Sequence, residues 1–321
     1  MIGLQPILYL VIPCYNEEQV LPETIPLFLA KLYELMDRDV VSRKSCVLCV
    51  DDGSSDKTWS VIKDYANRSP YVKGIRESRN NGHQNALMAG MMTAKDYADV
   101  VITMDADGQD DVNVIQRMMN LYISQHTDVV YGVRCDRKRD TWFKRTSAQM
   151  YYKILAKLGA DIVYNHADCR LVSKQVLNAL SGYDEVNLFL RGLFPLIGFK
   201  QEIVHYERQV RMAGETKYPL HKMISFGMNG LTSLSVKPLT IILTLGFVMV
   251  FVSFLGCFYA VISYLMGHVV SGWTSMMVFV CFVFGVQLIC LGVVGIYVGK
   301  IYMEVKHRPR YLISDRVGFD E

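Results

Sequence analysis

Two long apolar stretches near the end of the chain constrain its fold more than any other feature. Residues 239–266 and 273–299 contain no Asp, Glu, Lys, Arg or His. Each stretch is longer than the roughly 20 residues that a helix needs to cross the hydrocarbon core of a bilayer. The alternative, two buried helices of a soluble core, is disfavoured by this length. We therefore expect a two-helix transmembrane hairpin that follows a larger domain.

The distribution of basic residues around this hairpin predicts its orientation. The linker 267–272 contains no Lys or Arg, whereas Lys222 and Lys237 precede the first stretch and several basic residues follow the second. Lys and Arg are enriched on the cytosolic flanks of membrane helices. Residues 1–10 are too short a segment before Pro13 to be a signal peptide, and they lack its basic start. The larger domain is therefore expected in the cytosol.

The domain ahead of the hairpin alternates apolar, β-branched runs with helical patterns. This alternation is typical of a doubly wound, mainly parallel α/β sheet. The 34 Lys and Arg residues nearly balance 31 Asp and Glu residues, so the net charge does not indicate a nucleic-acid partner. Strands are expected at 7–12, 46–50, 72–75, 100–104, 128–131 and 204–212, with helices at about 18–36, 112–124 and 141–158, one that ends at about 66 and one that carries Met88, Met91 and Met92. Residues 165–171 are expected to form a loop that enters a short strand.

Carboxylates follow three of the expected strands: Glu17, the pair Asp51 and Asp52, and the pair Asp105 and Asp107. Ligands of open α/β sheets bind beyond the carboxyl ends of the strands. Asp105 and Asp107 are two residues apart, so their side chains share a face if the segment is extended. Paired carboxylate oxygens suit Mg²⁺ or Mn²⁺. The alternative for this pair alone is a solvated acidic turn that caps the next helix.

A basic set follows the acidic one along the chain, and it suits a second anion. Any single arginine of this set could instead lie on a solvated face. Residues 218–236 form an amphipathic pattern that suits a helix on a membrane surface, although packing against the sheet is an equal alternative. Cys46 and Cys49 form a lone C-x-x-C that we interpret as buried thiols rather than a metal site. The basic set comprises Arg134, Arg137, Arg170, Arg208, Arg211 and Lys217.

Four motifs resemble the signature of glycosyltransferase family 2, in the same order. They are Pro13-x-Tyr15-Asn16-Glu17, Val50-Asp51-Asp52-Gly53-Ser54-Ser55-Asp56, Arg79-Asn80-x-Gly82 and Asp105-Ala106-Asp107-Gly108-Gln109-Asp110. Two later motifs, followed by two apolar stretches, resemble the polyprenyl-phosphate branch of that family, which includes bactoprenol glucosyltransferases and, more distantly, dolichyl-phosphate mannose synthases. These motifs are Asp168-x-Arg170-Leu171 and Arg211-x-Ala213-Gly214-Glu215-x-Lys217-Tyr218-Pro219.

The resemblance implies a GT-A (Rossmann-like) catalytic domain at 1–217, a juxtamembrane amphipathic helix at 218–237, two transmembrane helices within 238–303 and a cytosolic tail at 304–321. It implies transfer of a sugar, with glucose from UDP-glucose expected first, to polyprenyl (undecaprenyl) phosphate at the cytosolic face of a bacterial inner membrane. Mannose, N-acetylhexosamine and aminoarabinose donors remain alternatives, as does an inactive membrane-anchored nucleotide-binding scaffold. A processive polysaccharide synthase is disfavoured, because the chain has no Gln-x-x-Arg-Trp motif.

The resemblance also implies roles for individual residues. Asp168 and Asp107 form the catalytic set, with Asp168 as a base or an orienting group, and Mg²⁺ or Mn²⁺ is expected on Asp105, Asp107 and Gln109. The chain departs from the usual pattern at His83, where relatives commonly have Lys, at Gly108, and at Ala167 and Cys169. Donor binding is expected at Pro13, Tyr15, Glu17, Asp52, Asn80, Gly82, Asp105 and Gln109, and acceptor-phosphate binding at Arg134, Arg170, Arg211 and Lys217.

Glycines recur along both apolar stretches, as in Gly246, Gly256, Gly285 and Gly292. Small residues allow membrane helices to approach closely. We therefore expect a homo-oligomer, a dimer or a tetramer.

Overall fold

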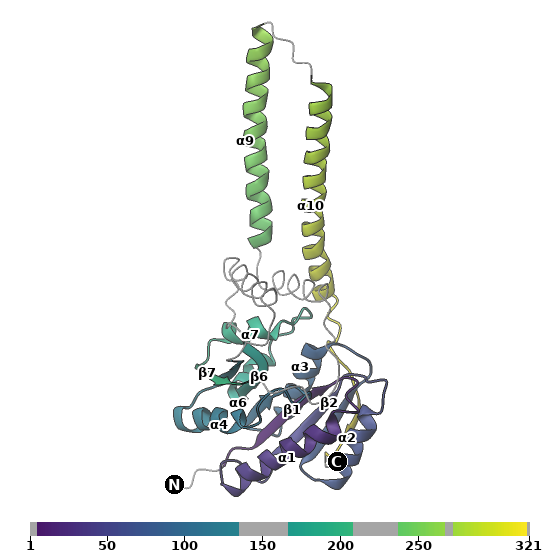
Figure 1. Ribbon diagram of the computed structural model, residues 1–321, viewed down its shortest axis with the longest axis vertical. Coiled ribbons are helices and arrows are strands. Elements are labelled where there is room, and N and C mark those ends of the chain that lie inside the picture. The colour runs from purple at the N-terminus through teal and green to yellow at the C-terminus, as the bar shows by residue number, and fades with distance from the viewer. Residues whose placement is uncertain (1–4, 135–165, 208–236, 267–271, 320–321) are drawn as a thin grey trace.

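A computed structural model describes residues 5–134, 166–207, 237–266 and 272–319 (Figure 1). Several predictions lie outside these residues: the amphipathic helix at 218–237 except for Lys237, the helix at 141–158, and Arg137, Arg208, Arg211 and Lys217. The strands are β1 (Leu8–Cys14), β2 (Cys46–Asp51), β3 (Val72–Glu77), β4 (Val100–Thr103), β5 (Val129–Arg134), β6 (His166–Ser173), β7 (Gln201–Tyr206) and β8 (Ile313–Val317). The helices are α1 (Leu21–Asp37), α2 (Thr58–Arg68), α3 (His83–Ala94), α4 (Val114–Gln125), α6 (Lys174–Leu180), α7 (Leu190–Ile197), α9 (Lys237–Leu265) and α10 (Trp273–Val305).

The described strands form one sheet in the order β7-β5-β6-β4-β1-β2-β3-β8. Strands β1, β2, β3 and β4 are parallel to their neighbours within this group, and β5 is parallel to β7. Strand β6 runs antiparallel between β4 and β5, and β8 runs antiparallel beside β3. The mainly parallel α/β sheet predicted from the sequence is therefore confirmed, with two antiparallel strands added to it.

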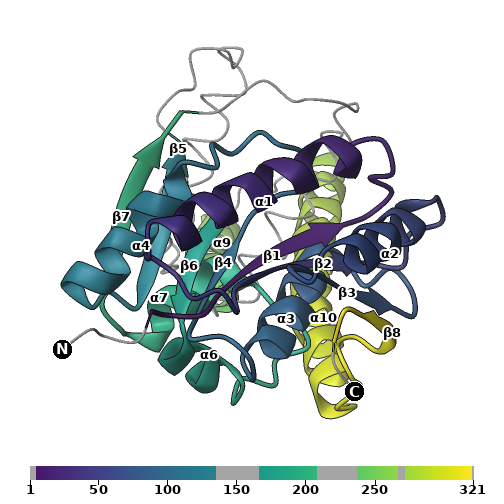
Figure 2. The ribbon, with the colours of Figure 1, turned by 90° about the horizontal axis from the view of Figure 1, so that it is seen from below.

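Helices cover both faces of the sheet (Figure 2). Residues Leu8, Leu10 and Ile12 of β1 pack with α1, α2 and α4, whereas Tyr9 and Val11 pack with α3, α6 and α7. Parallel strands that are buried on both faces are apolar along their whole length instead of alternating with polar residues. This burial explains why the sequence shows these strands as continuous apolar runs.

Helices α9 and α10 extend side by side from one end of the domain (Figure 1). Within them, Lys237–Gly256 and Phe282–Val305 have mean hydropathies of 2.5 and 2.2 and are almost entirely exposed. By length and composition, both are able to cross a membrane. Helix α10 continues to Val305, beyond the predicted end of the apolar stretch at 299, so its last turns carry charged residues such as Glu304.

The segment after α10 returns to the sheet. Strand β8 pairs with β3 through Gly74 and Val317, and the Phe319 ring lies 5.6 Å from that of Tyr97. Gly318 has a φ of +78°, and a Cβ there would lie 2.7 Å from the carbonyl oxygen of Val72, so only glycine fits this turn. The segment 304–321, which we predicted to be a cytosolic tail, thus contributes an edge strand to the domain.

Two predicted elements differ from the observed ones. We expected a loop at 165–171 that leads into a short strand, but β6 begins at His166 and carries Asp168 within it. We expected a strand from 204 to 212, whereas β7 begins at Gln201 and ends at Tyr206, and residues 208–212 lie outside the described residues. Both strands pair at long range with β5, a partner that local patterns do not identify.

Candidate active site

The pairing of β4 with β6 brings two distant carboxylates together. Thr103 lies opposite Arg170 in this antiparallel pair, so the chain two residues beyond Thr103 passes beside Asp168. The Thr103 hydroxyl donates a hydrogen bond to the backbone carbonyl of Asp168 at 2.5 Å. Asp105, the second residue after the strand, therefore faces Asp168 across the carboxyl end of β4.

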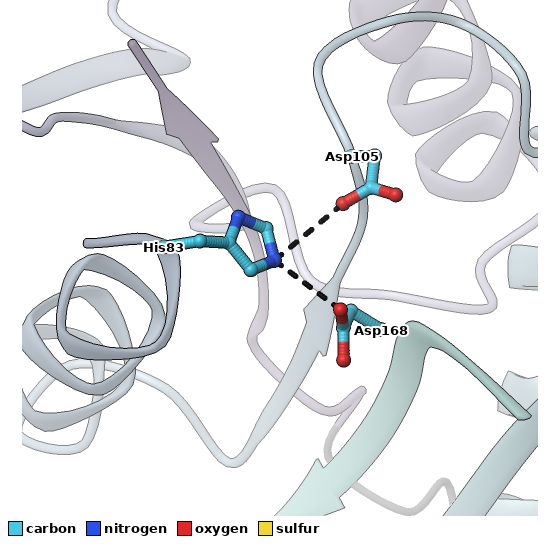
Figure 3. A group of neighbouring side chains, drawn as sticks. All are labelled: His83, Asp105 and Asp168. Atoms are coloured by element: carbon cyan, nitrogen blue, oxygen red, sulfur yellow. Dashed lines mark ion pairs between the residues drawn. The ribbon is translucent and has the colours of Figure 1, made fainter. Parts of the chain in front are cut away.

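His83 completes a cluster with these two aspartates (Figure 3). It is the first residue of α3, and its Nε2 lies 3.3 Å from Oδ2 of Asp168 and 3.7 Å from Oδ1 of Asp105. Burial of the imidazole opposes its charged form, but the contact with Asp168 and the charges of Asp168 and Asp105 raise the His83 pKa. Burial raises the pKa of Asp105 to about 6, against the effects of His83 and Arg134.

Asp168 is held by a bidentate ion pair with Arg191 of α7. Arg191 Nε lies 3.2 Å from Oδ1, and Arg191 Nη2 lies 3.0 Å from Oδ2. Burial alone opposes ionisation of Asp168, but the charge of Arg191 and the contact with His83 bring its pKa well below the usual range. A carboxylate that holds its proton so weakly is suited to orient cationic groups rather than to accept a proton.

The His83, Asp105 and Asp168 set fits a divalent cation by its donor chemistry. One nitrogen and two carboxylate oxygens, all within 4.8 Å of one another, converge from three elements. Ligands at about 2.1 Å from a metal and at right angles to each other lie about 3 Å apart, close to the two distances from Nε2. These residues would hold the metal that the family resemblance implies.

The predicted D-x-D geometry is different. The backbone turns at Ala106 and Asp107, and Gly108 follows with a φ of +68°, so the extended segment that we assumed is wrong. Oδ1 of Asp107 accepts a hydrogen bond from the backbone N–H of Gln109 at 3.1 Å, and Gln109 is nearly buried. Among the described residues, the possible metal ligands grouped with Asp105 are His83 and Asp168, and the metal roles of Asp107 and Gln109 stay predictions.

The side chain of Asp52 organises the loop that precedes α3. Its Oδ1 accepts from the backbone N–H of Asn81 at 2.7 Å, and its Oδ2 accepts from that of Gly82 at 3.0 Å. Burial raises the Asp52 pKa, and these two hydrogen bonds oppose the shift. Gly82 has a φ of +92°, which explains the glycine at the position before the helix. Asp52 thereby positions the backbone that leads to His83.

The remaining predicted donor residues surround this edge. Pro13 lies in the buried strand β1, which ends at Cys14, and the Tyr15 side chain is exposed just after the strand. The backbone N–H of Glu17 donates to the Thr58 hydroxyl at 2.8 Å, which fixes the turn after β1 against α2. Asn80 is exposed on the loop before Gly82. Their proximity to one edge agrees with the predicted donor site, and their individual roles stay predictions.

The two described arginines of the predicted phosphate site differ in environment. Arg134 Nη2 lies 3.5 Å from Asp105 and 2.7 Å from Asp110, so it reaches the cluster. Arg170 is fully buried, with its guanidinium 4.4 Å from the Phe194 ring and 3.9 Å from Asp168.

Burial of Arg170 lowers its pKa, and its nitrogens have no hydrogen-bond partner among the described residues. This position disagrees with direct phosphate binding by Arg170, because a guanidinium with no access to solvent does not meet an acceptor. Arg170 instead approaches Oδ1 of Asp168, whereas His83 approaches Oδ2.

Two residues of the cluster were not predicted as site residues. His83 was noted only as a departure from the usual Lys, and its place at the end of a polar turn that opens a helix was the available signal. Arg191 lies between Leu190 and Leu193, which are buried, and nothing in its neighbourhood distinguishes it from a solvated arginine. Its role depends on the packing of α7 near β6, which sequence periodicity does not reveal.

Comparison with known proteins adds independent information. Residues 9–181 match the family model described as Glycosyl transferase family 2. The chain is 46% identical over 310 residues to an uncharacterized glycosyltransferase, YkoT of Bacillus subtilis, covering 97% of this chain and 92% of that protein. It is 36% identical over 309 residues to the bactoprenol glucosyl transferase of Shigella phage SfX, covering 96% of this chain and 98% of that protein.

Proposed function

Because the chain belongs to glycosyltransferase family 2 and is a glycosyltransferase with a GT-A fold, we propose that it transfers a sugar from a nucleotide donor to a polyprenyl phosphate. The donor expected first is UDP-glucose, and the acceptor is undecaprenyl phosphate in a bacterial inner membrane. The observation that carries the proposal is the cluster of His83, Asp105 and Asp168 in a domain that is joined to two apolar helices.

The relatives support the acceptor class. Proteins named bactoprenol glucosyl transferase match nearly the whole chain, including the part that forms α9 and α10. Both helices are long and apolar enough to cross a bilayer. A glycosyltransferase that must reach a lipid-bound phosphate gains from such an anchor, because the anchor holds its active site beside the acceptor. The proposed location is the inner membrane, with the catalytic domain in the cytosol.

The donor would lie across the carboxyl edge of β1, β2 and β4. Tyr15, which is exposed after β1, offers a ring against the base, and Asp52 holds the loop that borders the same edge. A bound divalent cation would neutralise charge on the leaving diphosphate. The carboxylates of Asp105 and Asp168 would hold that cation, and the positive charge of Arg134 reduces the repulsion between them.

The proposed reaction is a single displacement with inversion at the anomeric carbon. The acceptor phosphate is ionised at neutral pH, so its attack needs orientation more than deprotonation. Asp168 fits an orienting role, because its ion pair with Arg191 fixes the carboxylate and keeps it charged. Arg134 faces the same space and could contact the acceptor phosphate. Of the predicted base and orienting roles for Asp168, we favour the second.

The test is a panel of nucleotide sugars offered to the purified full-length protein with a short polyprenyl phosphate. UDP-glucose is expected to give a glycolipid, and EDTA is expected to abolish its formation until Mn²⁺ or Mg²⁺ is restored. A glycolipid formed only with another sugar would support the reaction and correct the donor. Nucleotide binding with no glycolipid from any donor would support the nucleotide-binding scaffold instead, and chelator-insensitive transfer would overturn the metal assignment.

A further inference from the structure

His83 is held from both sides along the backbone. The residue before it, Gly82, donates its N–H to the buried carboxylate of Asp52. The residue after it, Gln84, accepts a hydrogen bond through Oε1 from the backbone N–H of Leu190 at 2.9 Å. The first turn of α3 is therefore fixed against both β2 and α7. This anchoring fixes the backbone from which the imidazole reaches toward Asp105 and Asp168 (Figure 3).

One ring nitrogen faces both carboxylates. Nε2 lies 3.3 Å from Asp168 and 3.7 Å from Asp105, and all three atoms lie within 4.8 Å of one another. The contact with Asp168 is within hydrogen-bond distance, whereas the contact with Asp105 is too long for a hydrogen bond, so hydrogen bonding accounts for at most one of the two. A cation placed among the three atoms would satisfy all of them at once.

The arginines leave part of this set available. Arg134 contacts Oδ2 of Asp105, whereas His83 faces Oδ1. Arg191 contacts both oxygens of Asp168 in a side-on pair, and each carboxylate oxygen has a second lone pair. The arginines thus resemble the outer partners that orient metal-binding carboxylates.

We propose that Nε2 of His83 is a ligand of the divalent cation, together with one oxygen each of Asp105 and Asp168. Imidazole binds Mn²⁺, Co²⁺ and Zn²⁺ better than Mg²⁺, which prefers oxygen ligands. His83 therefore gives this site a preference for a transition metal over Mg²⁺. The inference deepens the proposed function, because it names the metal class of that site, but it does not depend on which sugar is transferred.

The test uses Mn²⁺ alone with the full-length protein in detergent and a readout that is independent of turnover. Pulsed electron paramagnetic resonance of bound Mn²⁺ is expected to show ¹⁴N coupling from a directly bound imidazole. In competition, Mn²⁺ is expected to bind at least about tenfold more tightly than Mg²⁺. His83→Gln should remove the ¹⁴N coupling and weaken Mn²⁺ binding about tenfold or more, while Mg²⁺ affinity changes by less than about twofold.

Two variants serve as controls. His205→Gln replaces an exposed histidine on β7 and is expected to keep both the ¹⁴N coupling and the Mn²⁺ affinity. His83→Lys supplies a cation without a donor lone pair, so it should lose the coupling as His83→Gln does. Thermal unfolding of each variant, monitored without metal, shows whether a lost signal reflects an unfolded protein.

Two outcomes would overturn the inference. The first is Mn²⁺ bound without ¹⁴N coupling in the unmodified protein. The second is a folded His83→Gln variant that binds Mn²⁺ and Mg²⁺ with unchanged affinities. Either result would mean that His83 acts as an imidazolium paired with the two carboxylates. A failure of the proposed function appears separately, as the absence of any glycolipid while the ¹⁴N coupling and the Mn²⁺ preference persist.

Discussion

Oε1 of Glu304 accepts two hydrogen bonds from Asn187, one from the backbone N–H and one from the side-chain amide, both at 2.9 Å. Oε2 of Glu304 accepts a third from the backbone N–H of Val186, also at 2.9 Å. Glu304 lies in the last turn of α10, and Asn187 closely precedes α7, which carries Arg191. One carboxylate thus connects the base of an apolar helix to the helix that holds Asp168.

We predict that Glu304→Gln loosens this connection. Glutamine offers one acceptor oxygen in place of two and carries no charge, so at least one of the amides at 186 and 187 loses a charge-assisted hydrogen bond. Hydrogen exchange at Val186 and Asn187 should accelerate, and glycolipid formation should fall about tenfold while UDP affinity stays within about twofold. Glu207→Gln, at an exposed glutamate, is the matched control. Unchanged exchange at both amides would contradict the prediction.

The ion pair between Arg191 and Asp168 should be essential for turnover but not for donor binding. Arg191→Ala removes a bidentate partner and leaves the partly buried carboxylate of Asp168 poorly paired, which is destabilising. We expect glycolipid formation to fall about 100-fold with UDP affinity nearly unchanged.

Because Arg191 and Asp168 act as one unit, the effects of Arg191→Ala and Asp168→Asn on turnover should not add in the double variant. We expect a coupling free energy of about 1–3 kcal/mol. Additive losses in turnover would show that the two side chains act independently. Near-normal turnover of Asp168→Asn would exclude a catalytic role for that carboxylate.

Glu77 should make the folded protein less stable as the pH rises. Its side chain is buried, and Oε1 has no hydrogen-bond partner among the residues described. Burial raises the Glu77 pKa to about 7, with the Asn81 amide at 2.6 Å opposing the shift and the charges of Asp52 and Asp51 adding to it. The folded protein therefore binds this proton more tightly than the unfolded chain does.

The stabilisation from protonated Glu77 is complete below pH 4.5 and is lost as the pH rises through 7. Glu77→Gln keeps an acceptor for Asn81 and carries no charge. Between pH 5 and pH 8 this variant should lose less of its free energy of unfolding than the unmodified protein, by about 3 kcal/mol. Thermal unfolding across this range is the measurement. The slope should not vanish, because Asp51 and Asp52 also have raised pKa values, and equal slopes would refute the prediction.

Gly53→Ala should weaken donor binding beyond its effect on stability. Gly53 has a φ of +62°, and a Cβ there would lie 2.4 Å from the carbonyl carbon of Arg79, so the 79–82 loop must move. Gly198→Ala is a matched control, because Gly198 has a φ of +78° but its nearest neighbour would be 4.0 Å away.

Both glycine variants incur the left-handed backbone cost of about 1–2 kcal/mol. UDP affinity should fall about tenfold or more in Gly53→Ala alone. Equal affinities in the two variants would contradict the prediction, and calorimetric titration with UDP distinguishes the outcomes.

Local patterns predict the parts of this molecule that depend on local sequence. The apolar run that ends at Thr103 and the acidic residues after it correctly locate Asp105 at the carboxyl edge of the sheet, because period and turn residues are short-range signals. The same patterns do not reveal that β6 lies beside β4 or that α7 directs Arg191 at Asp168. These contacts join residues that are far apart in the chain, and they depend on tertiary packing.

The final strand illustrates the same limit. Residues 313–317 follow a long apolar helix and contain Ser, Asp and Arg, so they appear as a solvated tail. They form a strand only because β3 offers an unpaired edge at long range. Edge strands commonly carry charged residues, and such composition conceals their pairing.

The position of β8 has a consequence for biosynthesis. Both apolar helices precede β8 in the chain, so they leave the ribosome before the strand that completes the catalytic sheet does. Until then, β3 presents open backbone groups that invite pairing with other chains. If α9 and α10 enter the bilayer as proposed, the nascent enzyme is already tethered to the membrane when β8 pairs with this edge. Molecules that fail to insert are free to aggregate while the edge of β3 is still open.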